Sequence, residues 1–508
     1  MDMKVQKAKL GLKERYRLMT RDLGWTPSYQ PQEALFPYAD YEGIVIHDWE
    51  KWEDPFRLTM DAYWKYQAEK DRKFYAIIDA QAQNNGHLNI TDARYLSALK
   101  IFLQAISPGE YAAHKGFARV GREFPGVGTQ VACQMQAIDE LRHAQTQIHA
   151  LSNYNRYYNG FHAFIQQRDR IWYNSVPRSF FDDAMSGGPF EFIIAIGFSF
   201  EYVLTNLLFV PFMSGAAYNG DMATVTFGFS AQSDEARHMT LGLECIKFVL
   251  EQDPRNVPIV QRWLDKWFWR GLRLLSLVGT MMDYMLPKRV MSWAEAWDIY
   301  GEDNGGALFR DLARYGIRPP TGWEDAGKAR DHISHQFMLA LYQWSFGTAF
   351  HGWIPSDDDM DWLSAKYPDT FDRYYRPRWM HFRKLAEAGT PFRNVGLAKL
   401  CQTCQFPCVF TEADDPTLLC HRELERDGQR YHFCSDHCQT IFQHEPEKYV
   451  QAWLPMNQLF QGTSGGGGIE NWMKWVNLVD GQDNGDFEGS QDQCNFAAWK
   501  GQSTTNSR

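Results

Sequence analysis

The feature that most constrains this chain is a five-residue pattern that occurs twice. Residues 139–143 read Asp-Glu-Leu-Arg-His, and residues 234–238, 95 positions later, read Asp-Glu-Ala-Arg-His. On an α-helix, residues three positions apart lie about 60° apart around the axis, so the Glu and the His of each copy share one face. A carboxylate and an imidazole on one face make half of a metal site. The pattern therefore predicts two helices that each supply half of one centre.

Two isolated glutamates complete this set. Glu110 and Glu201 each lie in an apolar segment, about 30 residues before Glu140 and Glu235 respectively. A lone carboxylate inside an apolar helix is costly to bury without a metal or another partner. A single Glu-x-x-His match is most often a solvent-exposed pair, whereas two copies with the same flanking Asp and Arg favour a metal centre. We expect the ligands to be Glu110, Glu140, His143, Glu201, Glu235 and His238.

This ligand set is typical of ferritin-like di-iron proteins. In these, two helices of a four-helix bundle each supply a Glu-x-x-His pair and the other two each supply a Glu. Carboxylates and imidazoles suit non-haem iron that activates O₂, whereas Cys133 and Cys245 are predicted to sit away from the Glu-x-x-His faces. We therefore predict a mainly α-helical fold: a ferritin-like di-iron helical bundle with extra helices.

One apolar segment, residues 190–217, is apolar enough to suggest a membrane span, but Glu201 stands at its centre. A charged residue at the centre of a bilayer is costly by several kcal/mol. We therefore expect a helix buried on all sides inside a large bundle, and no membrane contact. The amino end carries no apolar stretch of a secretory signal, which predicts a cytoplasmic protein.

Six of the nine cysteines fall between residues 401 and 438. A Cys-x-x-Cys pair turns tightly enough for both thiolates to reach one tetrahedral ion, and a second close pair completes a four-cysteine site. Such clustering favours a metal in a reducing compartment over disulfides. Ordinary buried or redox-active cysteines remain the alternative. We predict a small cysteine-rich zinc module with the ligands Cys401, Cys404, Cys434 and Cys438.

Four regions are expected along the chain. They are an N-terminal arm with the first helices (1–90), the di-iron bundle (91–392), the zinc module (393–460) and a partly flexible tail (461–508). The formal net charge of −10, without any long run of Lys and Arg, argues against a nucleic-acid partner.

Two segments carry a resemblance to a known family. Residues 197–206 read Gly-Phe-Ser-Phe-Glu-Tyr-Val-Leu-Thr-Asn and residues 233–238 read Ser-Asp-Glu-Ala-Arg-His. With the ligand spacing, they resemble the oxygenase large subunit of bacterial multicomponent monooxygenases, phenol hydroxylases most of all, from Leu12 to Pro455. The resemblance implies hydroxylation of phenol to catechol with O₂. A toluene or benzene monooxygenase subunit, or a radical-generating di-iron oxidase, are the alternatives.

The resemblance also implies cofactors and partners. It implies two non-haem irons and a zinc in this chain, and β and γ subunits in an α₂β₂γ₂ hydroxylase. Electrons would come from NADH through a separate reductase with FAD and a 2Fe–2S cluster, and a small regulatory protein would complete the system.

Roles for further residues follow from the same resemblance. Thr205, one turn beyond Glu201, corresponds to an active-site threonine that helps to handle the oxygen intermediate. The polar residues near the opening of the site correspond to Asn206 and Gln232. The resemblance places the pocket gate at Ile106 and the pocket lining at Ile196, Phe200 and Phe209.

The aspartates of the duplicated pattern are expected to support the ligands. Asp139 and Asp234 lie about 40° from the histidines of their helices, so they are candidates to accept an imidazole N–H. Arg142 or Arg237 would hold these aspartates. The sequence leaves open whether each Asp serves the His of its own helix or that of the other.

Overall fold

The computed structural model describes residues 10–22, 27–35, 41–90, 92–158, 161, 175–286, 291–344, 354–388, 400–406, 408 and 421–452. Helices dominate these ranges, and they contain one two-stranded sheet. The predicted mainly α-helical bundle is confirmed. The tail predicted at 461–508 lies outside the described residues.

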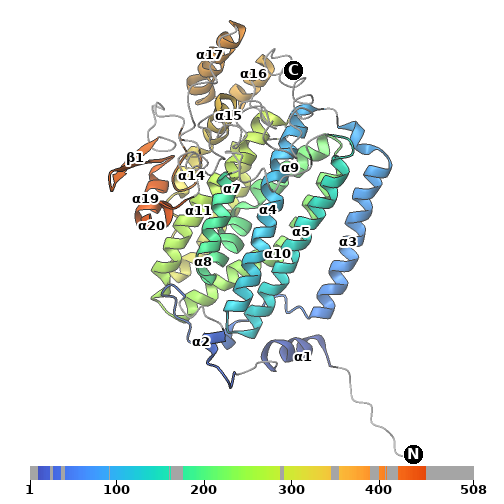
Figure 1. Cartoon of the computed structure of the whole chain (residues 1–508), viewed down its shortest axis with the longest axis vertical. Helices are drawn as coiled ribbons and strands as arrows, with labels where there is room; N and C mark the ends of the chain where they lie inside the picture. The colour runs from blue at the N-terminus through green and yellow to red at the C-terminus, as the bar shows by residue number, and fades with distance from the viewer. Residues whose placement is uncertain are drawn as a thin grey trace, which may run out of the picture.

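Four helical elements form the centre of the bundle (Figure 1): α4 (Ala93–Glu123), α5 (Val127–Tyr154), η5 (Ile194–Leu204) and α10 (Met222–Gln252). Side chains cap two of them, because Asp92 accepts hydrogen bonds from the backbone N–H groups of residues 94 and 95 and Asp221 accepts one from residue 224. Pro108 lies inside α4, and the helix continues through it to Glu123.

A further long helix, α3 (Met60–Gln83), packs against α10 and α5. It begins after Thr59, the N-cap, which lies in extended backbone. Although α3 belongs to the region predicted as the N-terminal arm, its packing makes it part of the bundle.

The apolar segment is bent and buried. It consists of α8 (Pro189–Ile193), the π-helical η5, and α9 (Asn206–Tyr218), with a bend of 50° between η5 and α9. No single described helix meets the length and hydropathy of a membrane span, and only this bent pair does so by length and composition. In α8 and η5 every residue but Tyr202 is buried within the protein, and so are most residues of α9.

A pair of glycines lets η5 and α10 approach closely. A Cβ added to Gly242 would lie 2.3 Å from the carbonyl oxygen of Gly197. Gly197 is one helical turn before Glu201 and Gly242 is one turn after His238. The close contact therefore sets the separation of two predicted ligands.

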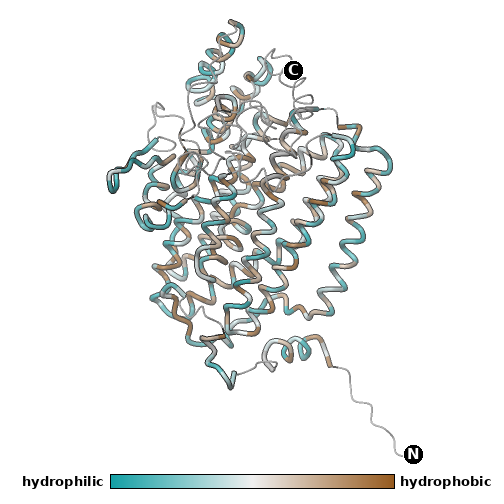
Figure 2. Tube along the Cα trace, in the orientation of Figure 1, coloured by the Kyte–Doolittle hydropathy of each residue, from teal (hydrophilic) through white to brown (hydrophobic). Residues whose placement is uncertain are grey.

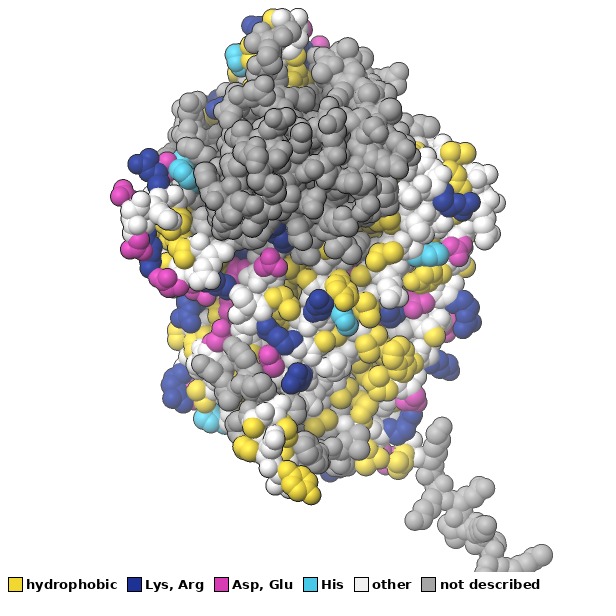
Figure 3. All heavy atoms as spheres, viewed as in Figure 1, with side chains coloured by type: hydrophobic (Ala, Val, Ile, Leu, Met, Phe, Trp, Pro, Cys, Tyr) yellow, Lys and Arg dark blue, Asp and Glu magenta, His cyan; other side chains and the backbone are white. Residues whose placement is uncertain are grey.

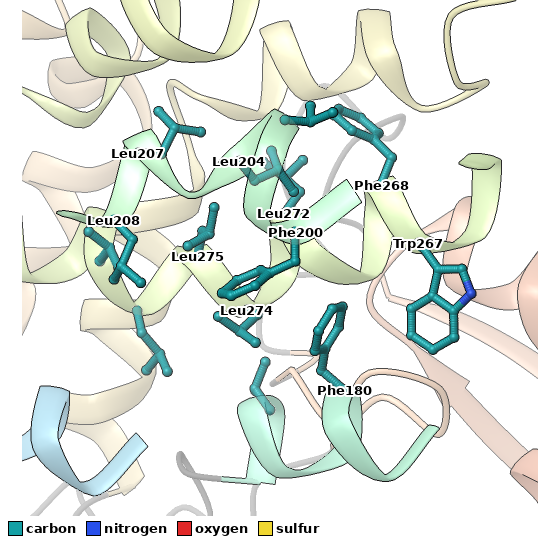
Figure 4. Close-up of a cluster of buried hydrophobic side chains, with 14 of the residues drawn as sticks. Phe180, Phe200, Leu204, Leu207, Leu208, Trp267, Phe268, Leu272, Leu274 and Leu275 are labelled. Carbon is teal, nitrogen blue, oxygen red and sulfur yellow. The ribbon is translucent and has the colours of Figure 1, made fainter. Parts of the chain in front are cut away.

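Aromatic and aliphatic side chains fill the space between η5, α9 and the next long helix, α11 (Asn256–Thr280). Figure 4 shows Phe200 of η5 and Phe180 of α7 (Ser175–Ser186) near leucines of α11. The ring centroids of Phe180 and Phe200 are 5.5 Å apart. This packing gives the bundle a closely packed apolar interior beside Glu201.

Shorter elements surround the centre. They are α1 (Leu12–Arg17), η1 (Leu18–Asp22), α2 (Gln32–Leu35), η2 (Trp49–Lys51), η3 (Gly86–Asn89), η6 (Met281–Met285), α12 (Trp293–Ala296), η7 (Trp297–Gly305), α13 (Gly306–Leu312), η8 (Ala313–Tyr315), α14 (Trp323–Ala329), α15 (Ile333–Trp344), α16 (Asp357–Lys366), η9 (Phe371–Tyr375) and α17 (Arg376–Glu387).

The C-terminal module contains a hairpin of β1 (Arg422–Arg426) and β2 (Gln429–Phe433), followed by α19 (Asp436–His444) and α20 (Pro446–Tyr449). The hairpin is among the most hydrophilic parts of the chain (Figure 2). The module packs on α11 through buried polar contacts. Trp269 donates to Ser435 (3.1 Å), and Arg270 donates to the carbonyl of Thr403 (2.8 Å).

Candidate metal centre

The six predicted iron ligands converge inside the bundle and are all buried. Ligand atoms of Glu110, Glu140 and His143 lie within 4.8 Å of one another, as do those of Glu140, Glu201 and His238. Glu140 belongs to both groups, so its carboxylate could contact an ion held by either group. Glu235 completes the second group, with Oε2 3.7 Å from Nδ1 of His238.

Both imidazoles present Nδ1 to the carboxylates. Nδ1 of His143 is 3.6 Å from Glu110 and 3.6 Å from Glu140, and Nδ1 of His238 is 3.2 Å from Glu140. These two nitrogens and Oε2 of Glu235 are buried without a hydrogen-bond partner. Buried polar atoms normally have partners, so three converging atoms without one fit the coordination of a metal ion. The donor set of four carboxylates and two imidazoles fits iron.

The opposite nitrogen of each imidazole contacts the aspartate of the other helix. Nε2 of His143 lies 3.1 Å from Oδ2 of Asp234, and Nε2 of His238 lies 3.3 Å from Oδ2 of Asp139. An Nε2–H donated to a carboxylate leaves Nδ1 free to coordinate a metal. The sequence left open whether each Asp contacts the His of its own helix or that of the other helix. The structure shows that each Asp contacts the His of the other helix.

The two predicted arginines contact these aspartates. Nη1 of Arg142 is 3.0 Å from Asp139 and 3.2 Å from Asp234, so one guanidinium joins both. Arg237 pairs with Asp139. Burial would raise the pKa of Asp234, but the hydrogen bond from His143 lowers it well below its usual range, which keeps the carboxylate ionised.

Helix α3 supplies a further layer that the sequence did not suggest. Tyr63 donates to Asp139 (2.6 Å), Gln67 donates to both Asp139 and Asp234 (2.8 Å each), and Nζ of Lys70 is 2.6 Å from Asp234. Their spacing of four and three residues, which places them on one face of α3, was the only signal in the sequence. The structure shows that this polar face is buried.

Two glutamines on α5 were also missed. Gln136 lies one turn before Glu140 and its amide is 3.0 Å from Oε2 of Glu201. Gln147 lies one turn after His143 and donates to Glu110 (2.9 Å). Each glutamine thus holds a carboxylate from a different helix. The only signal in the sequence was that each glutamine lies one helical turn from a predicted ligand.

Burial and neighbouring charges shift the pKa values of several of the predicted ligands away from their usual ranges. Burial raises the pKa of Glu110 to about 7, and burial with the charge of Glu235 raises that of Glu201 well above its usual range. Burial would lower the pKa of His238, but the charge of Glu140 raises it to about 10. The surroundings therefore disfavour the ionised forms of Glu110 and Glu201, and bound cations would favour them.

A small apolar cavity lies beside the ligands. Ile106, Ile196, Phe200 and Phe209, the four predicted pocket residues, line it together with Glu110, Glu140, Glu201 and Glu235. Thr205 also faces it. Four further lining residues escaped prediction because the helical wheel does not distinguish pocket from core: Gly109, Ala113, Phe181 and Leu208.

Of the three predicted polar residues, only Thr205 lines the cavity. It is buried, and its hydroxyl donates to the carbonyl of Phe200 (3.1 Å). Asn206 and Gln232 are half-buried, at the start of α9 and on α10, and neither lines the cavity.

The four predicted zinc ligands also converge. Cys401, Cys404, Cys434 and Cys438 are buried free thiols that form one group. Sγ of Cys404 is 3.4 Å from that of Cys434, which is 3.7 Å from that of Cys438. Sulfurs around tetrahedral zinc lie about 3.7 Å apart, whereas a disulfide is far shorter. Burial raises the pKa of the Cys404 and Cys438 thiols, and a bound cation would favour their ionised forms.

The site and fold agree with a known family. The profile of the Methane/Phenol/Alkene Hydroxylase family matches residues 25–253, the part that carries all six predicted iron ligands. The profile of the YHS domain matches residues 411–453, which include two of the four cysteines. The chain belongs to the methane/phenol/alkene hydroxylase family, and it is an oxidoreductase of the di-iron monooxygenase type.

Within that family, phenol 2-monooxygenases match over nearly the whole length. The oxygenase component of phenol 2-monooxygenase from Pseudomonas sp. (strain CF600) is 62% identical, covering 98% of this chain and 96% of the relative. The crystal structure of xenon-pressurized phenol hydroxylase from Pseudomonas sp. OX1 has a TM-score of 0.89 at 64% identity, covering 97% and 100%. The oxygenase component alpha subunit of an alkene monooxygenase from Xanthobacter autotrophicus is 27% identical, covering 91% and 93%.

Proposed function

We propose that this chain is the oxygenase component of a phenol monooxygenase, which hydroxylates phenol to catechol with O₂. The observation that carries the proposal is the buried centre, with six converging ligands beside an apolar cavity, in a chain 62% identical to such a component. Glu110, Glu140, His143, Glu201, Glu235 and His238 would hold two iron ions, which when bound supply the electrons that reduce O₂.

The side chains around the irons have separate tasks in this proposal. Asp139 and Asp234 fix the imidazoles with Nδ1 toward the metal. The apolar wall, including Ile196 and Phe209, positions the arene and excludes water. The hydroxyl of Thr205, which faces the same cavity, can hold or pass a proton there. Asn206 and Gln232 remain proposed polar residues near the opening of the site.

Partner proteins are part of the proposal, because the relatives are components of multicomponent systems. We assign β and γ subunits in an α₂β₂γ₂ hydroxylase, a small regulatory protein, and a reductase that passes electrons from NADH through FAD and a 2Fe–2S cluster. Hydrophobic side chains gather on the lower right of the face in Figure 3. Exposed hydrophobic residues suit protein partners, and the described residues of this kind include Tyr66, Ile77, Tyr111 and Ile148.

The test is turnover of the reconstituted system with ¹⁸O₂ and a panel of phenol, benzene and toluene. We expect two irons per chain and catechol from phenol carrying one labelled oxygen. Faster turnover of toluene or benzene than of phenol would favour the arene monooxygenase alternative. A stable tyrosyl radical without hydroxylated product would overturn the proposal.

A further inference from the structure

Outside the two metal centres described above, three side chains gather on the hairpin of the C-terminal module. They are His421, Glu423 and His432, whose ligand atoms lie within 4.8 Å of one another. We propose that they form a further metal site, open to solvent, that binds a zinc ion and joins the two strands. This site is independent of the proposed phenol chemistry.

The strand register brings the three residues to one face. β1 and β2 are antiparallel, with Glu423 directly opposite His432. Side chains opposite each other point to the same face of a sheet, and so do side chains two residues apart. His421 is two residues before Glu423 and joins that face. The turn that sets this register contains Asp427 and Gly428, both with positive φ (52° and 74°).

The distances suit a small cation. Oε1 of Glu423 is 3.5 Å from Nε2 of His421 and 3.4 Å from Nδ1 of His432. Ligand atoms about 2.1 Å from a tetrahedral zinc lie about 3.4 Å from one another, so both distances match a tetrahedral edge. The two imidazole nitrogens are 2.5 Å apart. They would separate by roughly 1 Å around the ion, which requires only a small rotation of the rings.

The surroundings suit an ion with an open coordination position. The His421 side chain is 7% exposed, whereas Glu423 is 40% exposed. Three protein ligands leave a fourth tetrahedral position for water. Nη1 of Arg430 lies 3.5 Å from Oε2 of Glu423, which leaves Oε1 turned toward the imidazoles. Such outer contacts orient ligands in metal sites.

The hairpin is tied to the four-cysteine cluster. The carbonyl of His432 accepts a hydrogen bond from the backbone N–H of Gln402 (2.8 Å), which lies between Cys401 and Cys404. His432 is also two residues before Cys434. An ion on the hairpin would therefore fix the strand that ends immediately before Cys434.

The experiment is calorimetric titration of zinc chloride into the full-length, iron-loaded protein after a chelator wash that removes loosely held metal. We expect one zinc per chain in addition to the retained metal. His432→Gln and His421→Gln should each weaken this binding at least tenfold. The matched control is His381→Gln, an exposed histidine on α17 outside the cluster, which should bind zinc as the natural protein does.

Two further measurements separate a lost ligand from a disturbed fold. The metal retained through the chelator wash should stay the same in Glu423→Gln, which keeps the shape of the side chain, while the added zinc binds more weakly. X-ray absorption of the added zinc should show nitrogen and oxygen neighbours without sulfur. Zinc binding of equal strength in the natural protein and in both histidine variants, or sulfur around the added zinc, would overturn the proposal.

Discussion

Nε2 of His143 on α5 lies 3.1 Å from Oδ2 of Asp234 on α10, so the imidazole of one helix is oriented by the carboxylate of the other. The reciprocal pair, His238 and Asp139, has the same geometry at 3.3 Å. The two copies of the duplicated pattern therefore support each other across the bundle, and neither helix can orient its own histidine alone.

The crossed pairs predict a selective effect of Asp234→Asn. The amide cannot replace the charge that orients His143, so the iron on that side should bind roughly 10- to 100-fold more weakly. Mössbauer spectroscopy should show one altered iron and one nearly unaltered iron. Asp358→Asn, an exposed substitution at the start of α16, is the control. Equal changes at both irons would contradict the crossed arrangement.

The shared position of Glu140 predicts that it matters for both ions. Glu140→Ala should lower the iron content for both sites, whereas Glu110→Ala should affect mainly the site with His143. Circular dichroism should stay close to that of the natural protein, because apolar packing supplies most of the stability of the helices. Metal analysis is the measurement. A Glu140→Ala protein that still holds two irons per chain would contradict the assignment.

The cysteine cluster predicts a separable zinc. Cys404→Ser should lose one zinc per chain and keep its iron, since the two clusters use different side chains. Cys408→Ser is the matched control, because Cys408 is also buried in the module but lies outside the group of four. Metal analysis of both variants decides. Equal zinc in the two proteins would exclude Cys404 as a ligand.

The position of Ile106 predicts an effect on product ratio. It lines the cavity beside Glu110, so Ile106→Ala should change which ring carbon faces the irons. A difference of about 1.4 kcal/mol between two orientations changes the isomer ratio tenfold. The isomers formed from a methylphenol are the measurement.

Leu99→Ala provides the comparison for Ile106. Leu99 is fully buried on the same helix and does not line the cavity. The Leu99→Ala substitution should lower the free energy of unfolding by about 2–5 kcal/mol without changing the ratio of product isomers. An unaltered ratio of product isomers in an iron-loaded Ile106→Ala enzyme would falsify the hypothesis that Ile106 is the pocket gate.

The close approach of η5 and α10 predicts that Gly242→Ala is destabilising. The added Cβ would lie 2.3 Å from a backbone oxygen, which cannot rotate away. Overpacking of this kind costs about 1–3 kcal/mol, and it should also displace Glu201 and so lower the iron content. Gly327→Ala on α14 is the control, because its Cβ would have no neighbour closer than 4.0 Å. Thermal unfolding and iron content are measured together.

The six proposed iron ligands, which converge in the structure, could be chosen from the sequence because their chemistry is local. Glu140 and His143 share a helical face by spacing alone, and a carboxylate such as Glu201 in an apolar helix demands a partner. The four cysteines were equally recognisable from their spacing. The contribution of Gln67 and Lys70 was missed, because polar residues on an outer helix look like ordinary surface residues until the packing of α3 against α10 is known.

The sequence by itself determined which side chains are the candidates for the chemistry and on which helical faces they lie, since the faces follow from a period of 3.6 residues per turn. Only the tertiary structure decided which Asp serves which His, that Glu140 belongs to both groups, and how Gly197 and Gly242 set the distance between their helices. These relationships join residues far apart in the chain. Their geometry depends on how whole helices pack, which no local pattern specifies.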